Sequence, residues 1–216
     1  KEMVTGFIQV DGSTIGAVAN RTALFDENGE KSADFDAVLT VDGAYKAADF
    51  INFCDAYDIP VLSLTNVKGY ATDVRSEKSI AKAVAKLTYA FANANVPKVN
   101  VITGEAYGSA YVTMNSKALG ADVTYAWPDA SIGMDANEAA KIMYADDIAK
   151  SADVQSVISE KAAEYAALQS GVESAAARGY VDTIINPEDT RKYVAAAFEM
   201  LYTKREDRPD KKHGTV

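Results

Sequence analysis

The stretch ITGEAYGSAYVTMNSKALG, residues 102–120, decides the fold. A β-type run ends at Gly104 and a helical pattern begins near Ser109, with no histidine, cysteine or lysine before Lys117. A strand that turns abruptly into a helix leaves the first helical N–H groups without intrahelical acceptors. The stretch is therefore either a tight structural corner or a corner whose backbone amides face a ligand.

The same strand–turn–helix cycle repeats along the chain. Asp11-Gly12 is a common hairpin turn signal between strands expected near residues 4–10 and 14–19. Further strands are expected at 37–41, 59–67, 96–104 and 121–128, and helices at 44–58, 76–95, 109–119, 136–147, 152–169 and 187–202. Residues 25–36 resemble a surface loop. Alternating strands and helices predict one α/β domain with right-handed crossovers.

Composition excludes several classes of protein. The 216 residues carry a net charge of −9, which argues against unselective binding to nucleic acid, and no apolar run approaches the roughly 20 residues of a membrane span. The single cysteine, Cys54, cannot form an internal disulfide, so a cytoplasmic location is expected, with Cys54 packed in the core. The basic residues of the tail, from Lys204 to Lys212, are expected to be solvated.

Catalysis by side chains has little support in the sequence. The only histidine, His213, lies in the charged tail, so neither a serine triad using Ser109 nor a Cys-His pair is expected. One histidine and one cysteine cannot make a zinc site, and no metal is expected. Five acidic residues near turns could act as acids or bases, but Asp129 and Asp135 are better explained as helix caps; the five are Asp73, Glu105, Asp129, Asp135 and Glu138.

Catalysis by the backbone remains possible at the corner. Gly108, Ser109 and Ala110 are three small residues in a row, which would let a ligand approach the main chain. Two amides that converge on one point at a helix start make an oxyanion hole. The residues from Val67 to Tyr70 form a similar corner one unit earlier.

At these residues the sequence resembles a known family. Four blocks match in order, and the most specific runs from AKLTYAFANANVPKVNVITG through EAYGSAYVTMNSKALGADVTYAWPDASIG, residues 85–133. The others are residues 3–20, 47–70 and 186–214. The chain resembles the C-terminal, biotin-side half of the carboxyltransferase subunit of biotin-dependent acyl-CoA carboxylases and decarboxylases. The resemblance implies a crotonase-like superhelix of ββα units with C-terminal helices over residues 1–216, without the N-terminal acyl-CoA half.

The resemblance also implies an activity. The family moves a carboxyl group between carboxybiotin and a short-chain acyl-CoA (acetyl-, propionyl- or methylmalonyl-CoA), and it holds oxyanions with backbone N–H groups. The family's second oxyanion hole then falls on Ser109 and Ala110 beside Gly108, and a second glycine is usual where Ser109 stands. Contacts to cofactor or acyl-CoA fall on Gly69, Tyr70, Tyr107, Tyr111, Val112, Gly133 and Met134, with a small acyl group favoured by Val112.

The implied partners depend on that activity. They are a biotin carboxyl carrier domain, a biotin carboxylase or a membrane decarboxylase subunit, and the N-terminal carboxyltransferase half. Self-association is expected, without nucleic acid or direct membrane insertion, and the isolated chain is expected to be inactive. Two alternatives stay open: a crotonase-type enoyl-CoA hydratase or isomerase that uses Glu105 or Glu138, and a non-catalytic oligomerisation module.

Overall fold

The computed structural model describes residues 2–151 and 153–206. The chain opens with the predicted hairpin, in which β1 (Met3–Val10) pairs antiparallel with β2 (Ser13–Asn20). Asp11 and Gly12 form the two-residue turn with φ angles of 49° and 78°. Two positive φ angles match the right-handed twist of the strands, which explains why Asp-Gly suits this turn.

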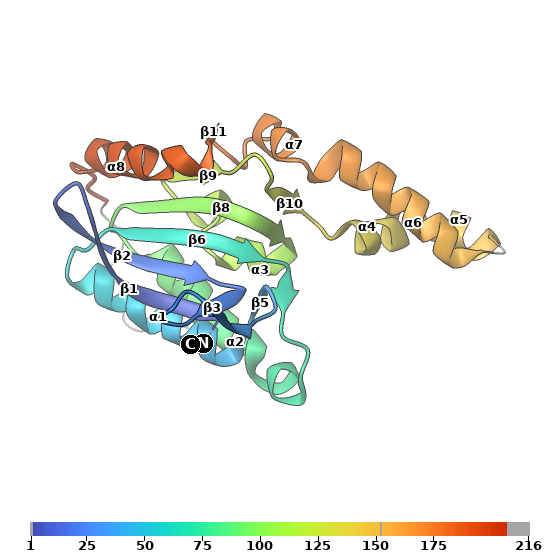
Figure 1. The fold of residues 1–216 in the computed structure, drawn as a ribbon, viewed down its shortest axis with the longest axis horizontal. Coiled ribbons are helices and arrows are strands. Elements are labelled where there is room, and N and C mark those ends of the chain that lie inside the picture. The colour runs from blue at the N-terminus through green and yellow to red at the C-terminus, as the bar shows by residue number, and fades with distance from the viewer. Residues whose placement is uncertain (1, 152, 207–216) are drawn as a thin grey trace.

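A seven-stranded sheet forms the centre of the molecule (Figure 1). Its order is β1-β2-β6-β8-β9-β11, and β6 (Val61–Val67), β8 (Lys98–Tyr107), β9 (Val123–Ala126) and β11 (Thr183–Ile184) continue in parallel from β2. The short β10 (Ser131–Gly133) also pairs in parallel with β8. The α/β layering predicted from the sequence is confirmed, and the strands of the parallel part end at one common edge.

Helices cover both faces of the sheet and divide its core in two. One buried cluster lies between the sheet and the pair α1 (Val41–Ala56) and α2 (Val74–Asn93), and it includes Ile51, Cys54, Leu87 and Phe91. A second lies between the other face and α8 (Thr190–Met200). The helices predicted at 44–58 and 76–95 therefore do pack against the sheet, and Cys54 is fully buried as expected.

Three segments differ from the sequence prediction before residue 75. The supposed loop at 25–36 contains the hairpin of β3 (Ala23–Phe25) and β4 (Lys31–Asp34). The strand predicted at 37–41 shrinks to β5 (Val38–Leu39), because Thr40 caps α1 and accepts a hydrogen bond from the Gly43 amide at 3.0 Å. β5 pairs instead with β7 (Gly69–Tyr70), which the sequence had presented as part of a turn.

The prediction at the deciding stretch is wrong in its boundaries. β8 continues three residues past Gly104, and α3 spans only Gly108–Thr113 rather than 109–119. The helix cannot continue because Asn115 adopts φ 54°, and Ser116 then starts a separate 3-10 turn at Lys117–Leu119. The helix expected at 136–147 is likewise two helices, α4 (Ala136–Met143) and α5 (Ala145–Lys150).

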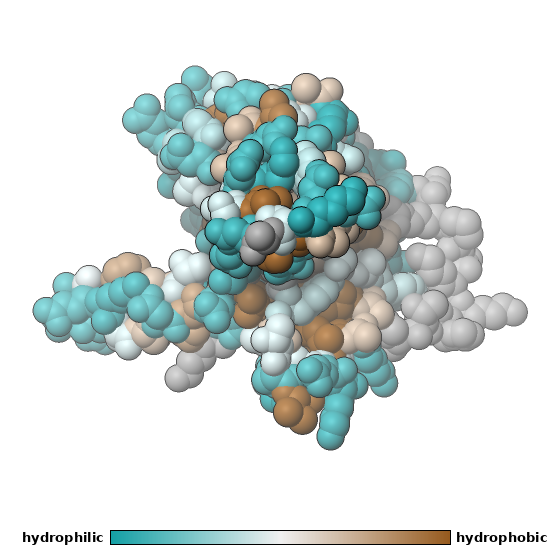
Figure 2. Space-filling model, turned by 90° about the vertical axis from the view of Figure 1, so that its right-hand side faces the viewer, coloured by the Kyte–Doolittle hydropathy of each residue, from teal (hydrophilic) through white to brown (hydrophobic). Residues whose placement is uncertain are grey.

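The helices after β10 form an arm that projects from the body (Figure 1). We call α4, α5 and α6 (Val154–Tyr165) the helical arm. After α6 a π-helical turn (Ala166–Ser170) leads into α7 (Val172–Ala177), which returns the chain to the sheet. Figure 2 looks at the end of the arm, where hydrophobic side chains lie among hydrophilic ones. Ile142, on α4, is 66% exposed.

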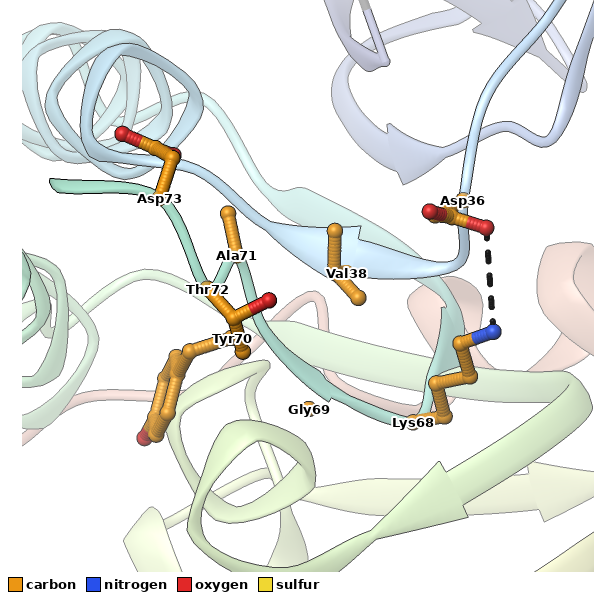
Figure 3. Close-up of a pocket in the computed structure, with 8 residues that line it drawn as sticks. All are labelled: Asp36, Val38, Lys68, Gly69, Tyr70, Ala71, Thr72 and Asp73. Carbon is orange, nitrogen blue, oxygen red and sulfur yellow. Dashed lines mark ion pairs between the residues drawn. The ribbon is translucent and has the colours of Figure 1, made fainter. Parts of the chain in front are cut away.

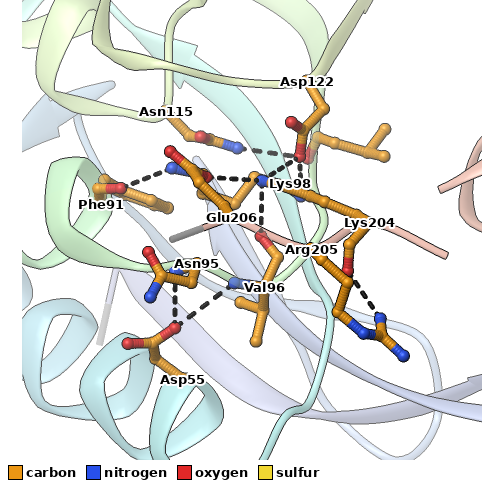
Figure 4. Close-up of polar contacts among 11 residues, drawn as sticks. Asp55, Phe91, Asn95, Val96, Lys98, Asn115, Asp122, Lys204, Arg205 and Glu206 are labelled. Atoms are coloured by element: carbon orange, nitrogen blue, oxygen red, sulfur yellow. Dashed lines mark hydrogen bonds and ion pairs between the residues drawn. The ribbon is translucent and has the colours of Figure 1, made fainter. Parts of the chain in front are cut away.

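Polar contacts hold the segment that follows α8 to the amino edge of the parallel strands (Figure 4). A 3-10 turn at Pro187–Asp189 leads into α8. Beyond α8 lies Lys204, whose side chain is only 13% exposed. Its Nζ lies 2.9 Å from Asp122 Oδ2 and donates to the Val96 carbonyl at 3.2 Å. The prediction of a solvated tail is therefore wrong for Lys204, while Arg208, Lys211, Lys212 and His213 lie outside the described residues.

Candidate active site

The corner between β8 and α3 lies at the carboxyl edge of the parallel strands, where open α/β sheets bind ligands. Gly108 is exposed and has a φ of 57°, a conformation that glycine adopts without steric cost. A Cβ atom built on it would meet no atom within 4 Å, so the space above this backbone is open. The main chain of the corner is thus accessible from outside.

The first turn of α3 carries no side-chain cap. Tyr107 occupies the cap position and makes no capping hydrogen bond. Ser109 is exposed, while the methyl group of Ala110 is 1% exposed and anchors the turn in the core. Because α3 has only six residues, its macrodipole is small, and the local N–H groups of Ser109 and Ala110 are the main source of positive potential.

Two tyrosines flank the corner in different ways. The Tyr107 hydroxyl donates to Ser131 Oγ at 2.9 Å and ties the end of β8 to β10. Burial, together with the charges of Glu105 and Asp135, raises the pKa of Tyr107, so its hydroxyl stays protonated at neutral pH. Tyr111 points into the core with 7% of its surface exposed, and burial raises its pKa to about 12. The ring of Tyr111 therefore holds α3 to the core.

The preceding glycine corner lies beside α3, which packs against β7. A pocket of about 480 Å³ runs along Gly69 and Tyr70 and is bordered by Val38 of β5 (Figure 3). At one side of it, Lys68 Nζ lies 3.8 Å from a carboxylate oxygen of Asp36. Gly69 and Tyr70 were expected here, whereas Asp36 and Val38 were not, because Asp36 was assigned to a surface loop and Val38 to a buried strand.

The remaining predicted residues surround the same edge. Gly133 pairs with Tyr107 in the β10–β8 register and has a φ of 136°. Met134 comes next in the chain and is exposed, and Val112 on α3 is 38% exposed. The structure thus gathers Gly69, Tyr70, Tyr107 and Gly133 around the Gly108 corner through paired or packed elements.

The acidic candidates have structural explanations. Asp73 caps α2 by accepting from the Arg75 and Ser76 amides, and Asp135 caps α4 by accepting from the Asn137 and Glu138 amides. Glu138 is exposed and lies 2.7 Å from Lys141 Nζ. The expectation for Asp129 is wrong, because it precedes the strand β10 rather than a helix. These contacts leave Glu105 as the one acidic side chain on a strand that leads into the corner.

The described residues contain neither a cluster of metal-ligand side chains nor a membrane-spanning helix. In residues 2–151 and 153–206, no three His, Cys, Asp or Glu side chains gather as they would around a metal ion. Within the same ranges, no helix has the length and apolar character to cross a membrane.

Comparison with known proteins adds the family. The carboxyl transferase domain family matches residues 1–216. The chain belongs to that family. A putative propionyl-CoA carboxylase beta chain of Bacillus subtilis (strain 168) is 45% identical over 218 residues, covering 100% of this chain and 41% of that protein. This carboxyl transferase domain therefore spans about two fifths of the length of the curated relatives it matches.

Other relatives and solved structures agree. The methylmalonyl-CoA carboxyltransferase 12S subunit of Propionibacterium freudenreichii subsp. shermanii is 40% identical, over 98% of this chain and 39% of that protein. A crystal structure of transcarboxylase 12S, a hexamer with methylmalonyl-CoA bound, matches with a TM-score of 0.88 and 40% identity over 99% of this chain and 40% of that one. The beta subunit of P. aeruginosa geranyl-CoA carboxylase matches with a TM-score of 0.79 and 25% identity over 99% of this chain and 39% of that one. The predicted crotonase-like α/β fold is confirmed by these matches.

Proposed function

We propose that this carboxyl transferase domain forms the biotin side of an acyl-CoA carboxyltransferase site. The proposal rests on the uncapped first turn of α3 beneath open space at Gly108. The relatives named for propionyl-CoA and methylmalonyl-CoA suggest a short-chain acyl-CoA as substrate. Val112, partly exposed beside the corner, suits a small apolar acyl group.

The residues at the corner fit a ring that carries a carbonyl oxygen. Biotin, when bound, supplies the carboxyl group and the base that exchanges the substrate α-proton. The amides of Ser109 and Ala110 donate hydrogen bonds to an oxygen that gains negative charge, and this stabilises the transition state more than the ground state. Gly69 and Tyr70 border the approach, and Tyr111 keeps the helix fixed so that the donors need no reorganisation.

Partners belong to the same proposal. A biotin carboxyl carrier domain would present the cofactor, charged by a biotin carboxylase or discharged by a membrane decarboxylase subunit. The acyl-CoA contacts would come from a further carboxyltransferase half, corresponding to the part of the relatives that this chain does not match. A relative forms a hexamer, and we propose that this chain self-associates as well.

The site removes one of the two side chains on which the hydratase alternative depends. A hydratase needs a side-chain acid or base at the reacting carbon, and Glu138 is held in an exposed ion pair with Lys141, so Glu105 on β8 is the side chain left for that role. A non-catalytic module would not need open backbone at Gly108.

The test is the removal of one amide proton without removal of a side chain. In the assembled carboxyltransferase that contains this chain, Ser109→Pro deletes the N–H in the first helical turn, where proline is tolerated. We expect kcat for carboxyl transfer to fall about 100-fold, the typical effect of losing one oxyanion donor. Ser109→Ala keeps the amide and loses only the hydroxyl, so it is the matched control and should retain activity. A Ser109→Pro enzyme as active as Ser109→Ala would reject the assignment.

A further inference from the structure

The strand that carries the corner breaks its ladder just before the corner. β6 and β8 pair regularly up to Thr65 and Ile102, and the next aligned pair is Val67 with Ala106. One residue of β6, Asn66, thus stands opposite three residues of β8. Such a bulge bends a strand and changes the direction of its remaining residues.

The other side of β8 changes partner across the same residues. Its pairing with β9 ends at Ile102 and Ala126, and its pairing with β10 begins at Glu105 and Ser131. Residues 103 and 104 therefore have a regular ladder partner on neither side. The last three residues of β8 lead into Gly108. They are attached to the sheet by their pairs with β10, by the pair of Ala106 with Val67, and by side-chain contacts at residues 103–105.

A side chain crosses the gap. The Glu105 amide donates to Asn66 Oδ1 at 3.0 Å, where a backbone carbonyl would stand in a regular ladder. Nearby, the Thr103 hydroxyl donates to the Thr65 carbonyl at 3.3 Å. The missing side chain at Gly104 makes the contact possible, because a Cβ there would lie 2.8 Å from Asn66 Oδ1. Asn66 and Gly104 therefore form one matched pair.

From this geometry we infer that Asn66 is a positioning residue for the proposed site. Its carboxamide fixes the bend of β8 at Glu105, three residues before Gly108, and so sets where the Ser109 and Ala110 amides point. Oxyanion donors must lie within a few tenths of an ångström of the developing charge, so a shift of the corner lowers the rate without removing a donor. The inference rests on the proposed function, because it assigns a role to a residue behind the same corner.

The first test measures the main chain directly. Hydrogen exchange of the full chain, read by mass spectrometry over peptides covering 103–113, should be about 10-fold faster in Asn66→Ala, because the Glu105 amide loses its acceptor. Asn66→Asp retains an acceptor oxygen and should exchange as the wild type does. Asn52→Ala, an exposed asparagine on α1, is the matched control and should leave these peptides unchanged.

The second test measures the reaction in the assembled carboxyltransferase. Asn66→Ala should lower kcat by about 10- to 100-fold while KM for the acyl-CoA changes less than about twofold, because misplaced donors weaken only transition-state binding. Asn66→Asp should restore most of kcat. Gly104→Ala pushes the carboxamide away without touching Asn66 and should reproduce the slow phenotype.

The results separate the two levels of the proposal. If Ser109→Pro lowers kcat about 100-fold while Asn66→Ala and Gly104→Ala keep wild-type kcat, the role of Asn66 is wrong and the oxyanion hole stands. If Ser109→Pro is fully active, the proposed site itself is wrong. Unchanged exchange in Asn66→Ala overturns the inference by itself, and a variant that unfolds leaves Asn66→Asp and Gly104→Ala to decide.

Discussion

Cys54 shows how closely single side chains fit in this core. Its sulfur packs against β2 at Gly16, where an added Cβ would lie 2.5 Å from Sγ. Burial is the main cause that raises the pKa of Cys54 to about 11, and the neighbouring Asp55 carboxylate adds to it. The thiol is therefore a packing group, in agreement with the prediction that Cys54 packs in the core.

This burial predicts an alkaline loss of stability. The thiol titrates near pH 9 when unfolded and near 11 when folded, so its contribution is complete below pH 9 and is lost as pH rises to 11. Across that window the free energy of unfolding should fall by about 2–3 kcal/mol more in the wild type than in Cys54→Ala. Denaturant titrations at several pH values measure the difference. Parallel curves for the two proteins would contradict the prediction.

Residues with distant partners could not be predicted from the sequence. The burial of Cys54 could be predicted, because the apolar residues of α1 around it repeat with helical spacing. Asn66 contacts Glu105, 39 positions away, and Lys204 contacts Asp122, 82 positions away. Sequence pattern describes periodicity within one element, and it contains no signal for which side chains meet after the chain folds back.

At the scale of elements, attachment of the chain after α8 depends on the pair of Lys204 with Asp122. Asp122 Oδ2 also accepts from the Lys98 amide at 2.8 Å, so one carboxylate joins β8 to the segment after α8. Lys98 Nζ in turn donates to the Phe91 carbonyl at the end of α2 at 2.7 Å. Three elements thus meet through charged groups that are largely withdrawn from water (Figure 4).

Removal of the Lys204 charge should therefore be costly. Lys204→Met leaves Asp122 without its cation in a site where its side chain is 20% exposed, and we expect a loss of about 2 kcal/mol in the free energy of unfolding. Lys31→Met breaks an exposed pair with Asp34 on a surface hairpin and should cost less than about 0.5 kcal/mol. Urea unfolding of both variants gives the comparison, and equal losses would refute the special role of Lys204.

Element types were predicted better than their ends. The hairpin, the central strands and the long helices were predictable from alternation, helical stripes and the Asp-Gly turn. The ends were missed where one residue decides them, as with Thr40 capping α1 and Asn115 stopping α3. Short strands such as β7 and β10 were missed because two or three residues show no periodicity, and partners chosen by the fold stabilise them.

At the scale of the whole molecule, the body and the helical arm differ in the packing that stabilises them. The body has two buried clusters on either side of one sheet, whereas α4 and α6 pack mainly against each other. The arm exposes Ile142 and Met143 at 66% and 56%. The sequence predicted helices here, but their projection away from the body could not be inferred from amphipathic spacing alone.

The division of the carboxyltransferase leads to a prediction for this chain by itself. Because it matches about two fifths of its relatives' length and we place only the biotin-side donors on it, the 216-residue chain should show no measurable carboxyl transfer. The assay supplies a carboxylated biotin carrier and propionyl-CoA and measures methylmalonyl-CoA. Addition of a complementary carboxyltransferase half should restore activity, and turnover by the chain alone would disprove the division.

The open main chain at Gly108 has a consequence for how such a protein can change over time. Under the proposed assignment, the reacting oxygen contacts atoms that every amino acid except proline possesses. Substitutions at Ser109 other than proline therefore keep the amide donors, while substitutions at the neighbouring Val112 change which acyl group fits. Substrate selectivity and catalytic rate would then change independently during evolution, so a new substrate preference can arise through intermediates that are all active.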